Sequence, residues 1–545
     1  MRKPLSVAVL LAATTSLFAQ SLTEKVEVSL VNVDVTVTSH GAPARGLTRD
    51  DFEVFEDGVA RPITNFYSVE PPAVTASTTP SAVTSDATVA DPTDDRFRRK
   101  VLVIIDNRHV SMFRRDLALA ALERFIDDRF TGGTYDWSIA LLSDKTHLLL
   151  PPTSDKEKLH ASLAMIRTIV ANPQRFARED TRPIAAPDGY DGAAESRVKA
   201  AETGLPPDPA ETRQTLTDFG TNLQIEADSG RTIDSIRDAV RSFAGVAGRK
   251  IILLVTGSLG LDAGISPLQA NPASFLQGPA AVAQGLASAT QMRDVLIHEA
   301  NASNVSFFIL NSEGLSSTND VMGHSDVSFA ANPNQLASMY WIARETGGRL
   351  MPGNSPELSL AEFDKASSSF YSLAYTPRHG DDGKYHTIKV RMKRPGYELH
   401  YRTGYSSVPA AVQLARAMQS PLAASMQPSS IPIDFTTGSS VPHDGGVLVP
   451  FSATVPAKNL QFIPAGRESV ARVDLYLSLF DERGRRVTSN HFVGEARAAN
   501  GSESAGNFVD TRQLLIKRGV PYRVVVAVHD QTTDAIGITS RRVRF

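Results

Sequence analysis

Acidic and hydroxyl-bearing side chains that directly follow predicted strands are the residues best placed for chemistry in this chain. Asp106 comes after five apolar residues, Val101–Ile105, four of them β-branched. Such a run is typical of a buried strand in a parallel sheet. Thr256 follows a second run of this kind, Ile251–Val255. Because α/β sheets bind ligands at the carboxyl ends of their strands, we expect Asp106 and Thr256 to meet at that edge.

Other candidate catalytic groups lack the pattern that their chemistry needs. Ser143, Asp144 and His147 follow one predicted strand without the sharp turn that exposes a nucleophile. His298 lies on a predicted helix without the second histidine of a zinc pair. Residues 379–384 resemble a calcium loop in composition, but they are read as a hairpin turn. With no phosphate-binding glycine loop in the sequence, we predict that the protein is not an enzyme.

Length, charge and cysteine content narrow the function classes. The chain has 545 residues, a net charge of -3 and no cysteine. That length predicts three or four domains. The charge argues against nucleic-acid binding, because nothing would neutralise a phosphate backbone. Without cysteine the domains depend on ordinary apolar cores rather than on disulfides.

The first residues have the pattern of an export signal. Arg2 and Lys3 supply positive charge, Leu5–Leu11 an apolar stretch, and Ala19 a small residue near an expected cleavage point. We therefore read residues 1–20 as a signal peptide and expect a periplasmic or secreted protein. No later stretch is long and apolar enough to predict a transmembrane segment.

From residue 98 the predicted strands alternate with predicted helices. This order is typical of a mostly parallel sheet with helices on both faces. A polar, proline-interrupted insertion is expected at 171–230. The predicted strands are Val101–Ile105, Trp137–Leu142, Leu148–Leu150, Ile251–Val255, Val305–Leu310 and Tyr371–Tyr375. The predicted helices are Asp116–Phe130, Asp155–Val170, Thr232–Ala247, Ala289–Ser303, Asn334–Glu345 and Leu358–Phe370.

The remaining segments flank this α/β domain, which we place at 98–408. Alternating apolar residues predict a small β domain at 21–70, and low apolar content predicts a flexible linker at 71–97. A hairpin at 385–405 is expected to extend the parallel sheet at its edge. A short helix and a joint at 409–430 lead to a predicted β-sandwich at 431–545.

Several short motifs resemble the von Willebrand factor type A (VWA) domain, in particular a VWA-related family of acidobacteria. The resemblance covers roughly residues 24–405 and implies a doubly wound, mostly parallel α/β sheet. The motifs are Val31–Val37, Gly46–Thr48, Asp51–Gly58, Thr346–Gly348, Tyr371–Pro377, Tyr385–Val390 and Tyr401–Tyr405.

The resemblance also implies a metal-ion-dependent adhesion site, which many VWA domains use to bind other proteins. That site is an Asp-x-Ser-x-Ser pattern, with a threonine and an aspartate from two further loops, around Mg²⁺. Here Asp106 fits the first ligand, but Arg108 and Val110 stand at the two serine positions and cannot be oxygen ligands. Thr221 is the candidate for the threonine, and Gly257 stands where the second aspartate is expected.

We therefore predict a degenerate metal site. Its candidate ligands are Asp106, Ser111, Thr221 and Thr256. Asn107 and His109 are alternative ligands beside Ser111, and Mg²⁺ is the ion that the resemblance implies. The opposing interpretation is that Asp106 pairs with Arg108 or caps the helix that follows.

The most direct functional prediction is therefore protein–protein interaction or adhesion in the cell envelope, without a complete metal site and without a cofactor. The sequence does not identify the protein partner. A structural scaffold of an envelope assembly is the alternative. A hydrolase is the third hypothesis and would rest on Ser143.

Overall fold

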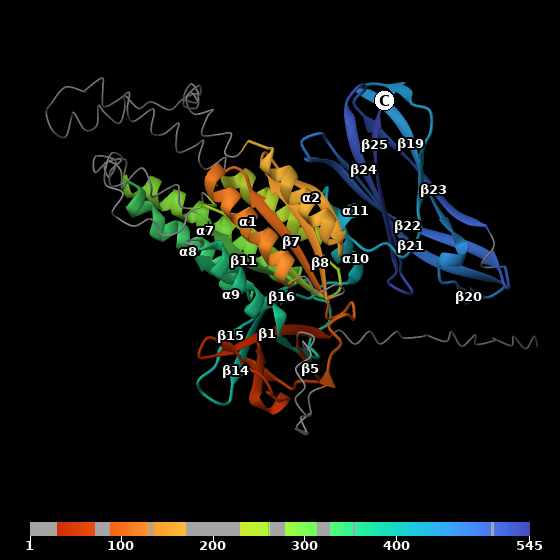
Figure 1. Ribbon diagram of the computed structural model, residues 1–545. Coiled ribbons are helices and arrows are strands. Elements are labelled where there is room, and N and C mark those ends of the chain that lie inside the picture. The colour runs from red at the N-terminus through yellow and green to blue at the C-terminus, as the bar shows by residue number, and fades with distance from the viewer. Residues whose placement is uncertain are drawn as a thin grey trace, which may run out of the picture.

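A computed structural model describes residues 30–70, 88–129, 134–170, 229–259, 261, 278–312, 327–352, 355–502 and 506–545. The chain is a mixed α/β protein in three units (Figure 1). An α/β unit is formed by β7 to α9, a small β unit lies beneath it, and the C-terminal strands form a third unit at its side. The predicted signal peptide, most of the linker at 71–97 and nearly all of the insertion at 171–230 lie outside the described residues.

The α/β unit is built on one six-stranded sheet. Its strand order is β12-β11-β10-β7-β8-β9, and every neighbouring pair is parallel except β8 and β9. The predicted strand around Val101–Ile105 is confirmed as β7, and it lies near the centre of the sheet, as expected of a fully apolar run. The strands are β7 (Arg99–Asp106), β8 (Tyr135–Leu142), β9 (Thr146–Thr153), β10 (Arg249–Thr256), β11 (Val305–Asn311) and β12 (Arg349–Pro352).

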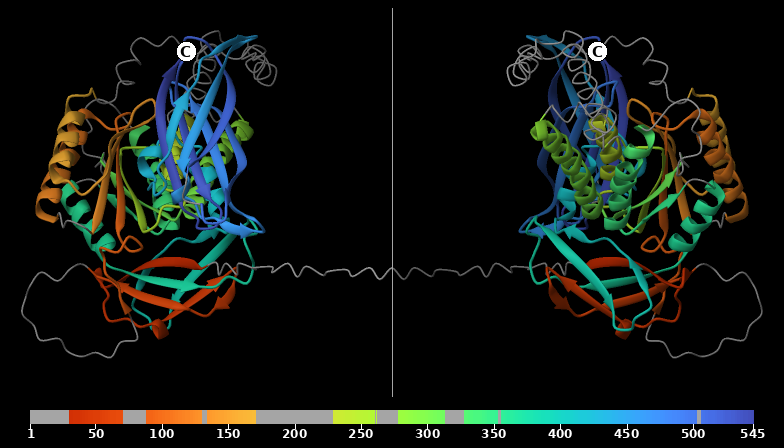
Figure 2. Two further views of the ribbon diagram at one scale, coloured as in Figure 1. Left: turned by 90° about the vertical axis from the view of Figure 1, so that its right-hand side faces the viewer. Right: turned by 90° about the vertical axis from the view of Figure 1, so that its left-hand side faces the viewer.

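Helices cover both faces of this sheet (Figure 2). Alternate residues of β7 face opposite cores, so Leu102 and Ile104 pack with α7, α8 and the helix at 229–242, whereas Val101 and Val103 pack with α1, α2 and α9. The labelled helices are α1 (Met112–Arg129), α2 (Lys156–Arg167), α7 (Gly278–Ala302), α8 (Val327–Glu345) and α9 (Pro356–Ser368).

The small β unit combines the two chain segments that flank the α/β unit. β1 pairs with β13 and β15, and β3 pairs with β14, so residues 31–69 share sheets with residues 370–406. Figure 2 shows these red and teal strands together beneath the helices. The members are β1 (Val31–Ser39), β2 (Ala42–Pro43), η1 (Arg49–Asp51), β3 (Phe52–Glu56), β4 (Val59–Arg61), β5 (Asn65–Val69), β6 (Thr88–Val89), β13 (Phe370–Tyr375), β14 (Tyr385–Met392), β15 (Glu398–His400) and β16 (Gly404–Ser406).

This pairing corrects two predictions. The strand at Tyr371–Tyr375 and the segment 385–405 do not extend the parallel sheet, and β14 and β15 lie in different sheets rather than in one hairpin. The alternation in Val31–Val37 creates an apolar face that must be covered. Leu373 of β13 and Ile388 of β14, which come more than 300 residues later in the chain, cover this face.

Buried arginines join the amino ends of the parallel strands to the small β unit. Nε of Arg99 donates to the carbonyl of Ser367 at 2.8 Å, at the negative end of the α9 dipole. Nη2 of Arg249 donates to Oγ1 of Thr36 on β1 at 3.1 Å. Both guanidinium groups lie near the ring of Phe370, at 5.7 and 4.7 Å from its centroid. Burial lowers the pKa of Arg249 to about 10, because its charged guanidinium group is held away from water.

The C-terminal unit consists of two antiparallel sheets around one apolar core. The core includes Val449 and Phe451 from one sheet and Leu475 and Val526 from the other. The strands are β17 (Asp434–Thr437), β18 (Val441–His443), β19 (Gly446–Pro456), β20 (Ile463–Ala465), β21 (Glu468–Phe480), β22 (Arg486–Ala499), β23 (Asn507–Ile516), β24 (Pro521–Asp530) and β25 (Ile536–Arg544), with η3 at Ala457–Asn459.

The connection at 409–430 is packed between units rather than left as a free joint. It contains the predicted helix, α10 (Ala410–Ala417), and a shorter one, α11 (Ala423–Met426). Leu414 and Met418 pack against Tyr476 and Val525 of the C-terminal sheets. The apolar side of this segment therefore joins the C-terminal unit to the α/β unit.

Candidate functional site: the carboxyl edge of the sheet

Asp106 is fully buried at the carboxyl end of β7, and protein donors surround its carboxylate. Oδ1 accepts hydrogen bonds from the backbone N–H groups of Arg108 at 2.9 Å and His109 at 3.2 Å. Oδ2 accepts from Oγ1 of Thr256 at 2.6 Å and lies 2.8 Å from Nδ1 of His109. Asp106 and Thr256 therefore meet at this edge, because Ile105 and Val255 are register partners on adjacent parallel strands.

These contacts keep Asp106 ionised. Burial alone would raise the pKa of its carboxyl group, but His109, Thr256 and the backbone N–H of Arg108 together hold that pKa below its ordinary value. An ionised carboxylate only accepts hydrogen bonds, so Nδ1 of His109 carries the hydrogen in this pair.

The neighbouring loop residues are engaged with other parts of the chain. Nη1 of Arg108 donates to the carbonyl of Ser143 at 3.1 Å. The amide of Asn107 donates to the carbonyl of Val170 at 2.7 Å and accepts from Nη1 of the buried Arg115 at 2.8 Å. The guanidinium and amide groups therefore fasten the loop to the ends of β8 and α2.

The predicted metal ligands that the structure describes, Asp106, Ser111 and Thr256, do not form an Mg²⁺ site. Ser111 lies at the start of α1, where its Oγ accepts from the N–H of Arg114 at 3.4 Å, and Val110 is fully buried. Thr221 lies outside the described residues. The oxygen atoms of Asp106 face an imidazole and N–H donors, which repel a cation, and Mg²⁺ demands a near-octahedral set of oxygen ligands. The described residues at this edge therefore do not fit the ion.

The opposing interpretation of Asp106 is also only partly right. Its carboxylate accepts from the backbone N–H of Arg108, and the basic side chain that contacts it is that of His109. It does not cap the following helix, because α1 begins only at Met112. Asp106 instead closes the loop that precedes the helix.

Two large apolar side chains are exposed directly after this loop. Met112 is 46% exposed and Phe113 is 70% exposed, both in the first turn of α1. Because large apolar side chains that are exposed in clusters mark contact surfaces, this pair at the carboxyl edge is a candidate contact surface.

The candidate nucleophile set does not form a catalytic triad. Oγ of Ser143 donates to Oδ1 of Asp144 at 3.3 Å, and Nε2 of His147 lies 2.7 Å from that same oxygen. In a triad the histidine, not the carboxylate, accepts the hydrogen of the serine. Ser143 and His147 therefore both contact the exposed carboxylate of Asp144.

The structure also contains an open cleft that no local sequence pattern could have revealed. It has a volume of about 800 Å³ and lies between the helices α7 and α8 and the small β unit. His298 packs on Tyr385 at 4.3 Å between ring centroids. The lining residues are Gly58, Arg293, Asp294, Ile297, His298, Trp341, Glu345, Tyr385, Thr387, Ile388, Lys389 and Thr403.

A second unpredicted feature is a cluster of His379, Asp382 and His386. Its signal in the sequence is the spacing His-x-x-Asp-x-x-x-His around a tight turn. The composition of 379–384 suggested a turn or a calcium loop, but the strand partner His386 lies just outside that stretch.

Comparisons with known proteins show only distant likenesses. No family model and no curated protein matches the chain. Among solved structures, an aerotolerance-related membrane protein from Bacteroides fragilis is 12% identical, with a TM-score of 0.22, over 49% of this chain and 98% of that one. The conserved hypothetical protein BatB from Bacteroides thetaiotaomicron is 13% identical, with a TM-score of 0.21, over the same shares. A β-glucuronidase from Bacteroides uniformis is 10% identical, with a TM-score of 0.16, over 32% of this chain and 19% of that one.

Likenesses at these TM-scores carry no argument about function, so the site has to be judged from its own geometry. In the described part of the chain, no helix combines the length and hydropathy needed to cross a membrane.

Proposed function

We propose that this protein is an exported VWA-type protein that binds a protein partner at the carboxyl edge of its six-stranded sheet, without a metal ion and without enzymatic activity. The order β12-β11-β10-β7-β8-β9, with helices on both faces, supports the VWA-type assignment. The exposed Met112 and Phe113 beside the Asp106 loop are the observation that carries the proposed binding role.

Asp106 supports the metal-independent form of this proposal. In a metal-dependent site, an ion holds the loops at the sheet edge and takes a carboxylate from the partner. Here the chain's own groups hold them, because the Asp106 carboxylate joins the β7 loop to the end of β10 through Thr256. A partner would then bind mainly through apolar contact, in which a few large side chains supply most of the affinity.

Capture of partners from an envelope extract tests the binding surface. The double variant Met112→Asp/Phe113→Asp places two charges on the surface, and we expect it to lose the captured partner. The matched control is Val493→Asp, on a valine of β22 that is 60% exposed. Partner capture that persists in the double variant, or that requires added Mg²⁺ in the unaltered chain, would contradict the proposal.

Export has its own test. Fractionation of cells that express the full chain should find it outside the cytoplasm, and a variant without residues 1–20 should stay inside. Equal distribution of the two forms would contradict the exported part of the proposal without affecting the binding surface.

A further inference from the structure

We propose that His379, Asp382 and His386 bind a divalent transition-metal ion, and that zinc is the ion their chemistry fits best. The three residues lie on the loop between β13 and β14 and at the start of β14, far along the chain from Asp106. One ligand atom from each lies within 4.8 Å of the other two. Two imidazoles and one carboxylate form a donor set that suits zinc rather than Mg²⁺ or Ca²⁺.

The distances match the size of a zinc site. Zinc bonds of about 2.0–2.1 Å place neighbouring donors about 3.4 Å apart in a tetrahedron. Nε2 of His386 lies 3.1 Å from Oδ1 of Asp382. The third donor, His379, packs its ring 3.7 Å from that of His386.

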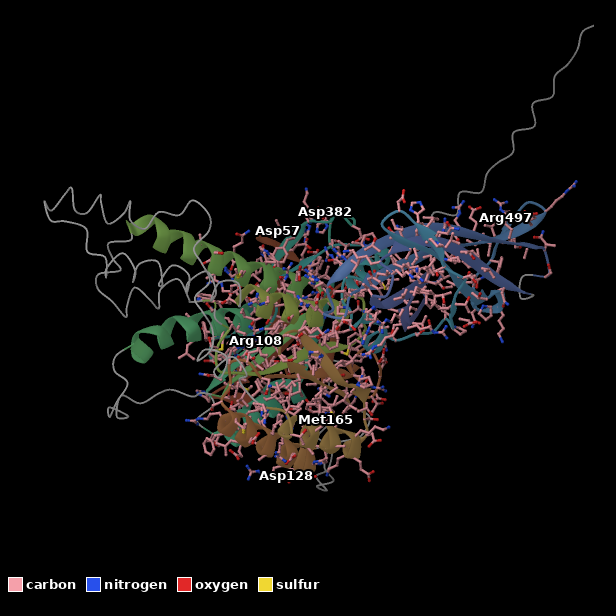
Figure 3. The ribbon with its side chains drawn as sticks, turned by 90° about the horizontal axis from the view of Figure 1, so that it is seen from above. Asp57, Arg108, Asp128, Met165, Asp382 and Arg497 are labelled. Carbon is pink, nitrogen blue, oxygen red and sulfur yellow. The ribbon has the colours of Figure 1, made fainter. Side chains whose placement is uncertain are left out.

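Both histidines are oriented as metal-binding histidines are. A ligating imidazole usually gives its second nitrogen to a carboxylate or a backbone carbonyl, which fixes the tautomer. Nδ1 of His386 lies 2.7 Å from Oδ2 of Asp57, and Nδ1 of His379 lies 2.9 Å from the carbonyl of Gly380. Nε2 is therefore the nitrogen through which each ring would bind an ion: that of His386 already faces Asp382, and that of His379 lies 3.2 Å from the hydroxyl of Tyr405, a contact it exchanges for the ion. Figure 3 shows Asp57 and Asp382, which both contact His386, at the same edge of the molecule.

Charge at the site also favours a cation. Asp57 and Asp382 both contact His386, and the nearest approach of a cationic side chain to Asp382 is the long one of Lys384, whose Nζ lies 3.9 Å from Oδ2. The fully buried Glu56 lies 3.4 Å from Nε2 of His379, but it is already paired with Arg61 at 2.6 Å. If Asp382 binds a divalent ion, the carboxylate of Asp57, which contacts the other nitrogen of His386, supplies a second negative charge near that ion.

Binding requires one ring to move. The two rings lie within 10° of parallel, so the lone pairs of their Nε2 atoms lie in separate planes and do not converge on one point. His386 is buried and held between two carboxylates. His379 lies on the loop with a side chain that is 22% exposed, so it is the ring that turns out of the stack.

Zinc titration of the full chain, stripped with EDTA and dialysed, tests this site. We expect one zinc ion per chain by calorimetry, and affinity at least about tenfold lower in His379→Gln and in Asp382→Asn. Asp57→Asn should also weaken binding, by about 10- to 100-fold, while the stoichiometry stays at one. A cooperative thermal unfolding transition of each variant without zinc establishes that the variants are folded.

The matched control is His443→Gln, which removes an exposed histidine of β18 in the C-terminal unit. The chain has 12 histidines, so this variant reports adventitious zinc. Co²⁺ in place of zinc should give the intense visible absorption of a tetrahedral site, and both ligand variants should lose it. Zinc affinity that is unchanged in His379→Gln and Asp382→Asn, or the absence of stoichiometric binding, would overturn the proposal and leave the cluster a hydrogen-bond network only.

Discussion

At the scale of single residues, Asp106 links the sequence to the site most directly. Its place after an apolar strand predicted its position at the carboxyl edge, and the parallel register brought Thr256 beside it. The sequence could not rank its partners, because His109 and Arg108 are both within reach of a carboxylate two or three residues away. The choice of His109 depends on the loop conformation, which Asn107 and Arg115 help to fix.

Replacing Asp106 by asparagine should destabilise the fold. The new NH₂ group cannot accept the hydrogen bonds that one carboxylate oxygen now takes, so we expect a loss of about 3 kcal/mol in the free energy of unfolding. Urea denaturation measures it. Thr256→Val, which removes one donor without changing shape, should cost about 1–2 kcal/mol. Equal stability of Asp106→Asn and the unaltered chain would show that these hydrogen bonds do not hold the edge.

The contribution of Asp106 should also depend on pH. Its pKa is lower in the folded chain than the ordinary value of 3.8, so its stabilisation is complete above about pH 4 and is lost as the pH falls through the folded pKa. Asp106→Asn has no such titration. The stability difference between the two proteins should therefore shrink below about pH 4, as denaturation at a series of pH values would measure. A difference that grows on acidification would contradict the assigned direction of the pKa shift.

At the scale of elements, β-branched apolar runs predicted the parallel strands well, since only buried strands use them so densely. The predicted strands at Trp137–Leu142, Ile251–Val255 and Val305–Leu310 are confirmed within β8, β10 and β11. The pairing of β1 with β13 was missed because alternation fixes which face of a strand is buried but not which strand covers it. The predicted start of one helix was wrong, because α8 begins at Val327 rather than at Asn334.

The turn from α8 into β12 depends on two glycines. Gly347 adopts a φ of +79°, and a Cβ on Gly348 would lie 1.8 Å from the carbonyl oxygen of Phe307 on β11. Gly348→Ala should therefore push β12 away from β11 and cost more than about 3 kcal/mol in thermal or urea unfolding. Gly230→Ala is the control, because its Cβ would meet no atom within 4 Å in the helix at 229–242. A tolerated Gly348→Ala would contradict the close approach of these strands.

An ion cluster joins α7 to the helix at 229–242. Glu299 accepts from Nη2 of Arg237 at 2.7 Å and from Nη2 of Arg241 at 2.8 Å. Burial acts to raise the pKa of Glu299, but these two arginines outweigh it and lower that pKa. Glu299→Gln should cost about 1–3 kcal/mol, whereas Glu357→Gln in the exposed pair with Arg124 should change stability by less than about 0.5 kcal/mol. Equal effects of the two variants in urea denaturation would show that the cluster adds nothing beyond a surface pair.

At the scale of the whole molecule, residues 31–69 and 370–406, which flank the α/β unit in the chain, form one small β unit together. Arg99 and Arg249 bind its strands and the end of α9 at the amino ends of the sheet, opposite the Asp106 edge. The carboxyl edge is thus the side of the sheet that the small β unit leaves open. The alternation of apolar residues predicted the separate β regions, but the joining of distant segments follows from tertiary packing that no local pattern contains.

A calorimetric titration of Mg²⁺ and Mn²⁺ into the full chain, with Asp106→Asn titrated alongside, tests most directly whether the carboxyl edge holds together without a metal ion. Because His109, Thr256 and two backbone N–H groups already occupy the carboxylate of Asp106, we predict no saturable binding that differs between the two proteins. Saturable binding of one ion in the unaltered chain that disappears in Asp106→Asn would contradict the metal-independent edge.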